Sequence, residues 1–406
     1  MAKLIILGAG VLQVPIIKYA KSQNNYVIVI SPRGNYPGFD YANKAYFHDV
    51  RDKEQILKIA KSENIDGIVT DQTDLPVTTA AYVAEELGLP GIGYHTSQLF
   101  TDKSRMNKKC IELGFSVPRS HTVSSMDEAL RASEQLPYPF IIKPHNNQGS
   151  RGVVKIVNED ELRKNFEFSS SFSSENKVLM EEFIEGDEIA VQGLVYEYKT
   201  WNLLCVDKVN FENTNVFAPK YVMHPPKKQF LTDRLFEINA AIMKGFGLKH
   251  GLTQSEFVYS EPKDTLYFIE TAARGAGAYI SSHIIPAACN IDTSKFLLDL
   301  SLGNPVDTKN FKESAKHAGY ISFYLNKGRI KEVKGLKEVL SLKEVIFFPY
   351  QKLNPGYESQ GLTDKTSRLG PIIMVAESRE IIEQTIEIIR NTLIISMEDG
   401  SGIIWD

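Results

Sequence analysis

Several features that would define a protein class are scarce or absent in this chain of 406 residues. It has three cysteines, Cys110, Cys205 and Cys289, and their wide separation offers neither a metal-binding nor a disulfide spacing. A reducing, cytoplasmic compartment is therefore expected, since the first residues also lack the layout of a signal peptide. The net charge is −4 without a basic segment, which argues against a nucleic-acid partner. Apolar runs are only as long as strands, so no membrane partner is expected.

A complete dinucleotide-binding fingerprint is also lacking. Gly8 and Gly10 follow the apolar run Leu4–Leu7, and such a glycine turn can bring backbone N–H groups close to a phosphate. The full pattern requires a third glycine and then an acid after the second strand, where this chain has Gln13 and Ser31. A tight strand-to-helix turn is the favoured interpretation, and an NAD-dependent oxidoreductase is the weaker alternative.

The order of the apolar patterns predicts a mixed α/β and α+β chain of about two to four domains. Over about the first hundred residues, strand-sized runs such as Tyr26–Ile30 and Gly67–Thr70 alternate with helical stretches, which implies a parallel sheet covered by helices. A second unit begins with a helix over Asp102–Leu113. Strands are expected to dominate from Pro137 to Glu188, with Ser169–Ser174 as a polar loop. The later elements are expected at Asp233–Phe246 (helix), Thr253–Ser260, Thr265–Thr271, Tyr320–Leu325, Val345–Pro349, Ile372–Val375 and Ser378–Leu393 (helix).

A first candidate site for phosphate lies around Lys143, at the end of the strand-like run Pro139–Pro144. The segment Gly149-Ser150-Arg151-Gly152 follows before another apolar run, which predicts a hairpin flap. Its backbone N–H groups and the charge of Arg151 suit a polyphosphate. An ordinary hairpin with a solvated arginine is the alternative.

A second candidate site follows at Val178–Glu188, where an apolar strand leads to Glu181 and then, through a glycine turn, to Glu188. Adenine needs an acceptor for its amino group and a donor for a ring nitrogen, and a carboxylate followed by exposed backbone supplies both. Ribose hydroxyls need an acceptor such as Glu188. A charged turn is the alternative.

Glu256 and Glu270 form the most informative pair, because a hairpin folded about the turn Glu261–Asp264 places them nearly opposite each other on one face. Like charges in that arrangement repel, and a bound cation reverses the effect. Ligands that are all oxygens suit Mg²⁺ bridging substrate phosphates. A solvated face is the alternative, but both faces of the hairpin are apolar, through Phe257, Val258, Phe268 and Ile269.

Small residues surround Arg274 just after this pair. An arginine beside a phosphoryl-transfer centre stabilises the charge that develops in the transition state. A structural arginine in a glycine-rich connection is the alternative.

Taken in order along the chain, these candidates resemble the ATP-grasp superfamily of the carboxylate–amine ligase type, including L-amino-acid ligase-like, carbamoyl-phosphate synthase large-chain-like and biotin carboxylase-like proteins. The resemblance covers almost the whole chain, and Asp364–Gly370 is similar to part of the C-terminal domain of such proteins. It implies a pre-ATP-grasp domain with a parallel sheet over residues 1–98 and an ATP-grasp domain over 99–308, with a mobile lid at about 117–184. A C-terminal α+β domain over 309–406 completes the expected architecture.

The resemblance also implies roles for individual residues. Those assigned to ATP are Lys103 and Lys143 (phosphates), Gly149, Ser150 and Gly152 (flap), Glu181 (adenine), Phe183 and Ile184 (backbone contacts) and Glu188 (ribose). Glu256 and Glu270 would ligate Mg²⁺, for which Mn²⁺ can substitute, and Arg274 would face the acyl phosphate or the carboxylate. The family usually has an asparagine two residues after the second metal glutamate, where this chain has Ala272, so one metal ligand is missing.

The implied reaction moves the γ-phosphoryl group of ATP to a substrate carboxylate, giving an acyl phosphate that an amine attacks. The expected partners are a small-molecule carboxylate and an amine, such as amino acids, and a second copy of the chain in a homodimer. The alternatives are a carboxylase-type enzyme that activates bicarbonate and a non-catalytic ATP-binding sensor, which Ala272 favours.

Substrate specificity is expected in the segments Val206–His224 and Tyr279–Asn290. Lys208, Lys220 and His224 can bind an acidic substrate, but solvated surface is the favoured interpretation of each.

Overall fold

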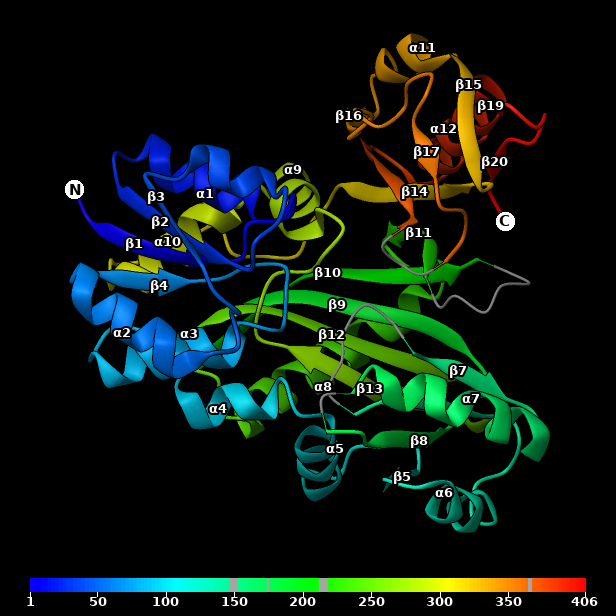
Figure 1. The fold of residues 1–406 in the computed structure, drawn as a ribbon, viewed down its shortest axis with the longest axis horizontal. Helices are drawn as coiled ribbons and strands as arrows, with labels where there is room; N and C mark the ends of the chain where they lie inside the picture. Colours follow the sequence, from blue (N-terminus) through cyan, green and yellow to red (C-terminus); the bar gives the residue numbers. More distant parts are fainter. Residues whose placement is uncertain (146–151, 174, 212–217, 364–366) are drawn as a thin grey trace.

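The computed structural model describes residues 1–145, 152–173, 175–211, 218–363 and 367–406, which form the sheets and helices drawn in Figure 1. The predicted mixed α/β class with an N-terminal parallel sheet is confirmed. The division into domains at residues 98 and 308, and the extent of the lid, stay predictions.

The N-terminal sheet is parallel, with strand order β3–β2–β1–β4. Its strands and the helices that follow them are β1 (Lys3–Leu7), α1 (Val14–Ser22), β2 (Tyr26–Ser31), β3 (Lys44–Phe47), α2 (Lys53–Glu63), β4 (Gly67–Val69), α3 (Val77–Glu86) and α4 (Tyr94–Leu99). The inner strands are continuous runs of buried aliphatic residues, as expected for a parallel sheet with both faces covered. One covering helix, α10 (Thr293–Leu302), comes from far along the chain and packs against this sheet (Figure 1).

A small antiparallel sheet in the predicted lid has the order β5–β8–β6–β7. Its elements are β5 (Ser120–Val123), α6 (Met126–Ser133), β6 (Phe140–Pro144), β7 (Val154–Ile156), α7 (Glu159–Ser171) and β8 (Val178–Glu182). β6 and β7 pair as the hairpin that the sequence predicts.

Helix α7 corrects the sequence interpretation, which expected mainly strands here and a polar loop from Ser169. The side chain of Asn158 accepts a hydrogen bond from Glu161 N and caps the helix, whose first turn is acidic. Leu162, Phe166 and Ser169 are buried at helical spacing, so the serine-rich end belongs to the last turn of the helix.

The central sheet has nine strands, with β13–β12–β9–β10–β11–β14–β18–β16 in order and β20 beside β14. These strands are β9 (Asp187–Tyr196), β10 (Lys199–Asn210), β11 (Pro219–His224), β12 (Gly251–Ser260), β13 (Thr265–Ala272), β14 (His317–Leu325), β16 (Val345–Phe347), β18 (Leu369–Ala376) and β20 (Ile403–Ile404). Because β11 pairs with β14, one sheet runs across the predicted domain boundary at residue 308.

The remaining elements cover this sheet or extend it. The helices are α5 (Lys103–Glu112), α8 (Thr232–Gly245), α9 (Ile285–Cys289), α11 (Leu336–Leu340) and α12 (Arg379–Thr392). A further sheet of order β17–β15–β19 is formed by β15 (Gly328–Lys334), β17 (Glu358–Ser359) and β19 (Ile394–Met397). Short turns of 3-10 helix at Pro37–Tyr41, Gln229–Leu231 and Glu261–Lys263, and a π-helical turn at Ile280–Ile284, complete the described elements.

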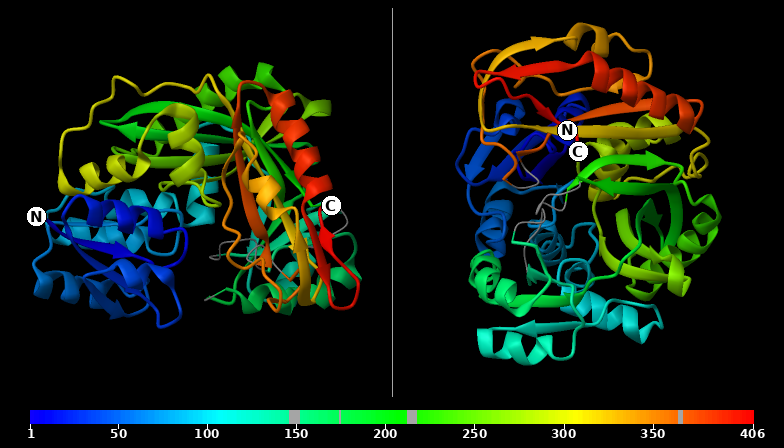
Figure 2. Two further views of the ribbon diagram at one scale, coloured as in Figure 1. Left: turned by 90° about the horizontal axis from the view of Figure 1, so that it is seen from above. Right: turned by 90° about the vertical axis from the view of Figure 1, so that its right-hand side faces the viewer.

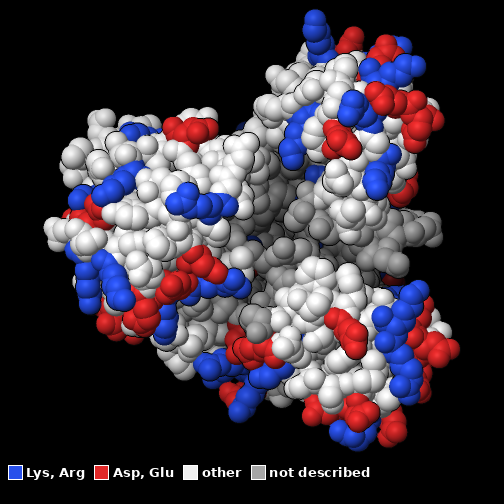
Figure 3. All heavy atoms as spheres, in the orientation of Figure 1, with Lys and Arg blue, Asp and Glu red and all other residues white. Residues whose placement is uncertain are grey.

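The molecule has three lobes around a central hollow. Figure 2 shows the N-terminal sheet standing apart from the C-terminal strands. On the face seen in Figure 3, the hollow lies between the lobes, and positive and negative side chains are interspersed on them. Within the described ranges, no helix combines the length and the apolar character that a membrane crossing requires.

Candidate active site

A row of charged side chains crosses four neighbouring strands of the central sheet. Glu270 on β13 pairs in register with Glu256 on β12, which confirms the predicted opposition of the two carboxylates. On the other side of Glu256, Glu188 on β9 pairs in register with Lys208 on β10. Each pair is aligned by a hairpin, and the pairing of β9 with β12 brings the two pairs onto one face, because Glu188 is two positions from Ala190, the partner of Glu256.

Two lysines neutralise the carboxylates of this row. Lys208 Nζ lies 2.6 Å from Glu256 Oε2 and 3.3 Å from Glu188 Oε2. Lys103 Nζ lies 3.4 Å from Glu270 Oε2. Burial disfavours the charged form of Lys208, whose side chain is 10% exposed, yet the nearby Glu256 and Glu188 raise its pKa, so it stays a cation. The row therefore combines close carboxylates with permanent positive charge.

The lid sheet contributes a second ion pair to the same region. Lys143 Nζ on β6 lies 2.8 Å from Glu181 Oε1 on β8, and these side chains are 11% and 7% exposed. Burial opposes the charge of Lys103, but Glu270 and Asp74, with a smaller contribution from Glu181, raise its pKa. The first residue of α5, the lid and the central sheet thus meet, and the predicted phosphate and adenine residues come together with the predicted metal pair.

The segment that connects the lid sheet to the central sheet contains Phe183 and Ile184. Lys155 Nζ lies 3.9 Å from the centroid of the Phe183 ring, and Ile184 is buried. A Cβ atom at Gly186 would be 2.1 Å from Tyr259 O, so only glycine lets the link pass this close to β12. Asn210 Nδ2 then donates to Glu188 Oε1 at 2.7 Å, which fixes the predicted ribose carboxylate.

Only part of the predicted flap can be located. Gly149, Ser150 and Arg151 lie outside the described residues, whereas Gly152 has φ of +76°. A Cβ atom there would be 2.8 Å from Pro144 Cγ, so this position requires glycine for two reasons. The contact of the flap with phosphate stays a prediction.

Arg274 is held in place by an acidic residue of the N-terminal unit. Its Nε and Nη2 donate to the two carboxylate oxygens of Asp74 at 2.7 and 2.9 Å, a bidentate pair. Its Nη1 donates to Gln254 Oε1 at 2.6 Å, and Gln254 Nε2 donates to Glu256 Oε1 at 2.8 Å. Gln254 therefore connects the arginine to the row of carboxylates.

Asp71 clamps the segment that follows the arginine. Its Oδ1 accepts a hydrogen bond from Gly275 N at 2.9 Å, and its Oδ2 accepts one from Ser281 Oγ at 3.3 Å. Burial raises the pKa of Asp71 to about 6, although these hydrogen bonds and the charge of Arg274 work in the opposite direction. A Cβ atom at Gly275 would be 2.1 Å from Ser281 Oγ, so this close contact depends on glycine. We call Asp71, Asp74, Arg274 and Gly275 the arginine anchor.

The interpretation of three residues as solvated surface is wrong. Lys208 belongs to the row, Lys220 is buried and pairs with Asp406 at 2.8 Å, and His224 is 3% exposed with its Nδ1 2.8 Å from Cys205 O. Burial lowers the pKa of His224, which favours its neutral form. Each of the three side chains projects from β10 or β11 into the fold, so the usual exposure of these polar residue types does not apply at these positions.

The glycine turn after β1 is filled by a side chain of the chain itself. A Cβ atom at Gly8 would lie 3.2 Å from the buried side chain of Gln13, whose Nε2 donates to Asp71 O at 2.7 Å. This packing agrees with the tight-turn interpretation.

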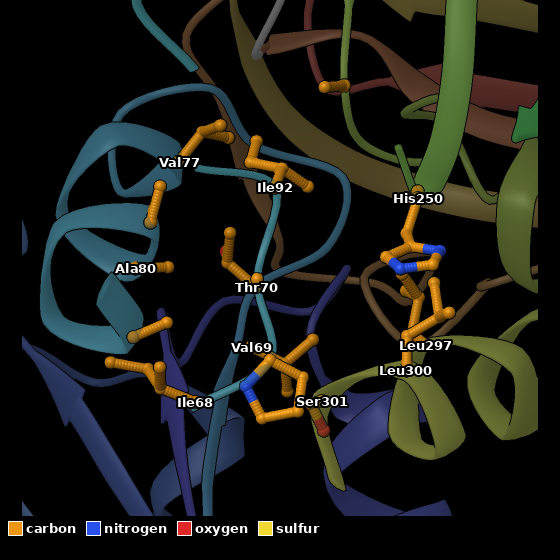
Figure 4. Close-up of a pocket in the computed structure, with 16 residues that line it drawn as sticks. Ile68, Val69, Thr70, Val77, Ala80, Ile92, His250, Leu297, Leu300 and Ser301 are labelled. Carbon is orange, nitrogen blue, oxygen red and sulfur yellow. The ribbon is translucent and has the colours of Figure 1, made fainter. Parts of the chain in front are cut away.

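A separate pocket lies where the N-terminal unit meets the central sheet (Figure 4). It is lined by Val77 and Ala80 from α3, Leu297 from α10 and His250, which directly precedes β12. Its described lining is mainly apolar and contains neither carboxylate nor lysine, so it does not share the charged groups of the row.

Sequence reasoning missed several residues of the site. Gln254 is two positions before Glu256 and therefore shares its face, a signal that strand alternation offered. Lys208 and Asn210 alternate in the same way on β10. Asp71 and Asp74 gave no local signal, because their partners lie about two hundred positions away.

One segment of the chain matches the model of a known domain family. Residues 136–282, less than half of the chain, match the sequence model of the ATP-grasp domain.

Relatives with different names match part of the chain. The alanine–anticapsin ligase of Bacillus subtilis is 25% identical over 280 residues, which cover 63% of this chain and 58% of that protein. The C-terminal section of the carbamoyl phosphate synthase large chain of Methanopyrus kandleri is 25% identical over 260 residues, covering 59% of this chain and 44% of that protein. The chain thus matches less than two thirds of the length of either relative.

Solved structures share the fold over nearly the whole chain. The L-amino acid ligase from Bacillus licheniformis aligns with a TM-score of 0.82 at 20% identity, covering 98% of this chain and 99% of that one. The biotin carboxylase domain of the 2-oxoglutarate carboxylase from Hydrogenobacter thermophilus, crystallised with MgADP and bicarbonate, aligns with a TM-score of 0.75 at 18% identity, covering 99% of this chain and 91% of that one.

Proposed function

We propose that this chain is an ATP- and magnesium-dependent ligase that activates a substrate carboxylate as an acyl phosphate and transfers it to an amine, releasing ADP and phosphate. One observation carries the proposal: Glu256 and Glu270 face each other on the central sheet of an ATP-grasp fold, next to Lys103 and Lys208. Such an arrangement suits phosphoryl transfer, in which a protein mainly positions groups and neutralises charge.

The residues present fit a divalent cation of the magnesium type. Glu256 and Glu270 offer only oxygen ligands, which Mg²⁺ prefers, and Mn²⁺ accepts the same set. Among the described residues, no third His, Cys, Asp or Glu joins them, as expected of a site that a nucleotide completes. When bound there, the cation would supply positive charge for the phosphate oxygens.

The nucleotide would lie between the lid sheet and the central sheet. Lys103 and Lys143 would bind its phosphates beneath the flap formed by Gly149, Ser150 and Gly152. Glu181 would accept from the adenine amino group, Phe183 and Ile184 would provide backbone contacts, and Glu188 would hold the ribose. The support is the convergence of the two ion pairs from these sheets.

Arg274 would stabilise the negative charge that develops on the transferred phosphoryl group or on the acyl phosphate. Burial opposes its charge, but Asp74 raises its pKa, so the guanidinium is always available as a cation. A closed lid would exclude water, which would otherwise hydrolyse the acyl phosphate.

Amino acids are the substrates we propose, because the relatives include an alanine–anticapsin ligase and an L-amino acid ligase. A homodimer in the cytoplasm belongs to the same proposal. Activation of bicarbonate is the second candidate function, favoured by the fold shared with a biotin carboxylase domain.

The test is release of ADP from MgATP, scanned across pairs of amino acids and, separately, with bicarbonate. We expect release that depends on both a carboxylate and an amine. Release with bicarbonate alone would favour the carboxylase, and ATP binding without release in any mixture would favour a sensor.

A further inference from the structure

The central sheet offers a replacement for the metal ligand that the sequence lacks. Ala272, which stands where the ATP-grasp resemblance leads one to expect an asparagine, pairs in register with Gln254 across β12 and β13. Side chains of directly paired residues point to the same face. A glutamine amide therefore projects on the side of the sheet where the asparagine amide would be, from the neighbouring strand.

The space around this amide is complementary to it. Ala272 is buried and ends at its Cβ atom, so it takes up less space than the expected asparagine opposite Gln254. Gln254 reaches past it and bridges Glu256 Oε1, at 2.8 Å, and Arg274 Nη1, at 2.6 Å.

The distance between the amide and Glu256 matches that of two ligands of one cation. Mg²⁺ binds oxygens octahedrally at about 2.0–2.1 Å, which puts neighbouring oxygens about 2.9 Å apart. The amide end of Gln254 is 2.8 Å from Glu256 Oε1. Without a cation, the amide directs its N–H group at the carboxylate, as electrostatics requires.

We propose that Gln254 supplies the third oxygen ligand of the metal site, in place of an asparagine at position 272; this inference rests on the proposed function. Rotation about the last side-chain bond, which is soft, exchanges Oε1 and Nε2 and turns the oxygen toward the cation shared with Glu256. Arg274 keeps its bidentate pair with Asp74 and its contact from Nη1 to Gly275 O at 3.2 Å. The same rotation turns Nε2 toward Nη1, and because both groups are donors they move apart, which leaves Nη1 to bind a substrate anion.

The decisive experiment measures metal binding directly. Mn²⁺ is titrated, with electron paramagnetic resonance detection, into protein saturated with a non-hydrolysable ATP analogue. Gln254→Met keeps the length of the side chain and removes its oxygen, so we expect metal affinity to fall roughly 10- to 100-fold. The double variant Gln254→Ala/Ala272→Asn returns the amide to the other strand and should recover most of the affinity.

Controls separate this inference from the proposed function. Gln384→Ala, on the exposed face of α12, should bind metal like the unaltered protein, and Glu270→Gln should lose binding. Thermal unfolding without nucleotide verifies that each variant is folded.

The outcomes are distinct. Unchanged metal affinity in Gln254→Met, with loss in Glu270→Gln, overturns the role of Gln254 and leaves the proposed function standing. Weaker binding in Gln254→Met without recovery in the double variant also contradicts a ligand role. If neither the unaltered protein nor Glu270→Gln binds metal with nucleotide, the proposed function itself is wrong.

Discussion

The charged row on the central sheet and the arginine anchor are held together by contacts at different separations along the sequence. Neighbouring strands align Glu256 with Glu270 and Glu188 with Lys208 by backbone pairing. Arg274 instead depends on Asp74, two hundred positions earlier in the chain, and on the packing of the N-terminal unit against the sheet. The row should therefore respond to changes in its own charges, and the anchor to changes in a separate unit of the fold.

The largest effect is expected in the row. Glu270→Gln removes a negative charge from the proposed metal site and keeps the size of the side chain, so ADP release should fall about 1,000-fold. The matched control is Glu261→Gln, an exposed acid in the turn of the same hairpin, which should leave the rate within about twofold. Normal ADP release by Glu270→Gln would contradict the assignment of the row.

A second change in the row tests its charge balance. Lys208→Met leaves Glu256 and Glu188 without their buried cation, so the free energy of unfolding should fall by about 3 kcal/mol. Mg²⁺ with ADP should restore part of this loss, because a bound cation replaces the missing charge. Thermal unfolding with and without Mg²⁺ and ADP measures both effects, and equal losses under the two conditions would argue against a cation between these carboxylates.

The anchor should make the stability of the protein depend on pH through Asp71. The pKa of Asp71 is about 6 in the folded chain, above its ordinary value of 3.8, so the native state holds this proton more tightly than the unfolded state. Its contribution to stability is complete below about pH 4 and is lost as pH rises through 6, in total about 2–3 kcal/mol.

Asp71→Asn removes this titration and can still accept from Gly275 N. The unfolding free energy of the unaltered protein minus that of the variant should therefore decrease between about pH 4 and 7 and stay constant above, as denaturant titrations can show. A constant difference across this range would mean that Asp71 titrates normally.

The smallest effect is expected for Asp74→Asn, which keeps one acceptor for Arg274 and removes the charge. Turnover should fall about tenfold with little change in the KM for ATP, because the arginine loses its orientation and the nucleotide keeps its contacts. Asp49→Asn alters an exposed ion pair in the same unit and should have no such effect. A rise in the KM for ATP with unchanged turnover would show that the anchor serves nucleotide binding instead.

The sequence was most informative where local geometry decides the outcome. The opposition of Glu256 and Glu270 followed from strand alternation and a short turn, and the parallel sheet from alternating strands and helices. Helix α7 was missed because serines at its end resemble a loop, although Leu162 and Phe166 carry the helical spacing.

Other parts depend on contacts that only the folded chain brings together. Lysine usually lies at the surface, but Lys208 is buried because β10 lies within the central sheet. The pairing of Asp74 with Arg274 requires the packing of two units of the fold, so no local pattern around either residue predicts it.

The continuous nine-stranded sheet limits how this molecule can be dissected. Expressing residues up to 308 alone would leave the whole length of β11 without its neighbour β14. The unpaired N–H and C=O groups of β11 would then form an exposed edge strand, which can pair with strands of other copies of the chain. Shortened versions that end there should precipitate, so the C-terminal strands are better regarded as part of the scaffold than as a detachable appendage.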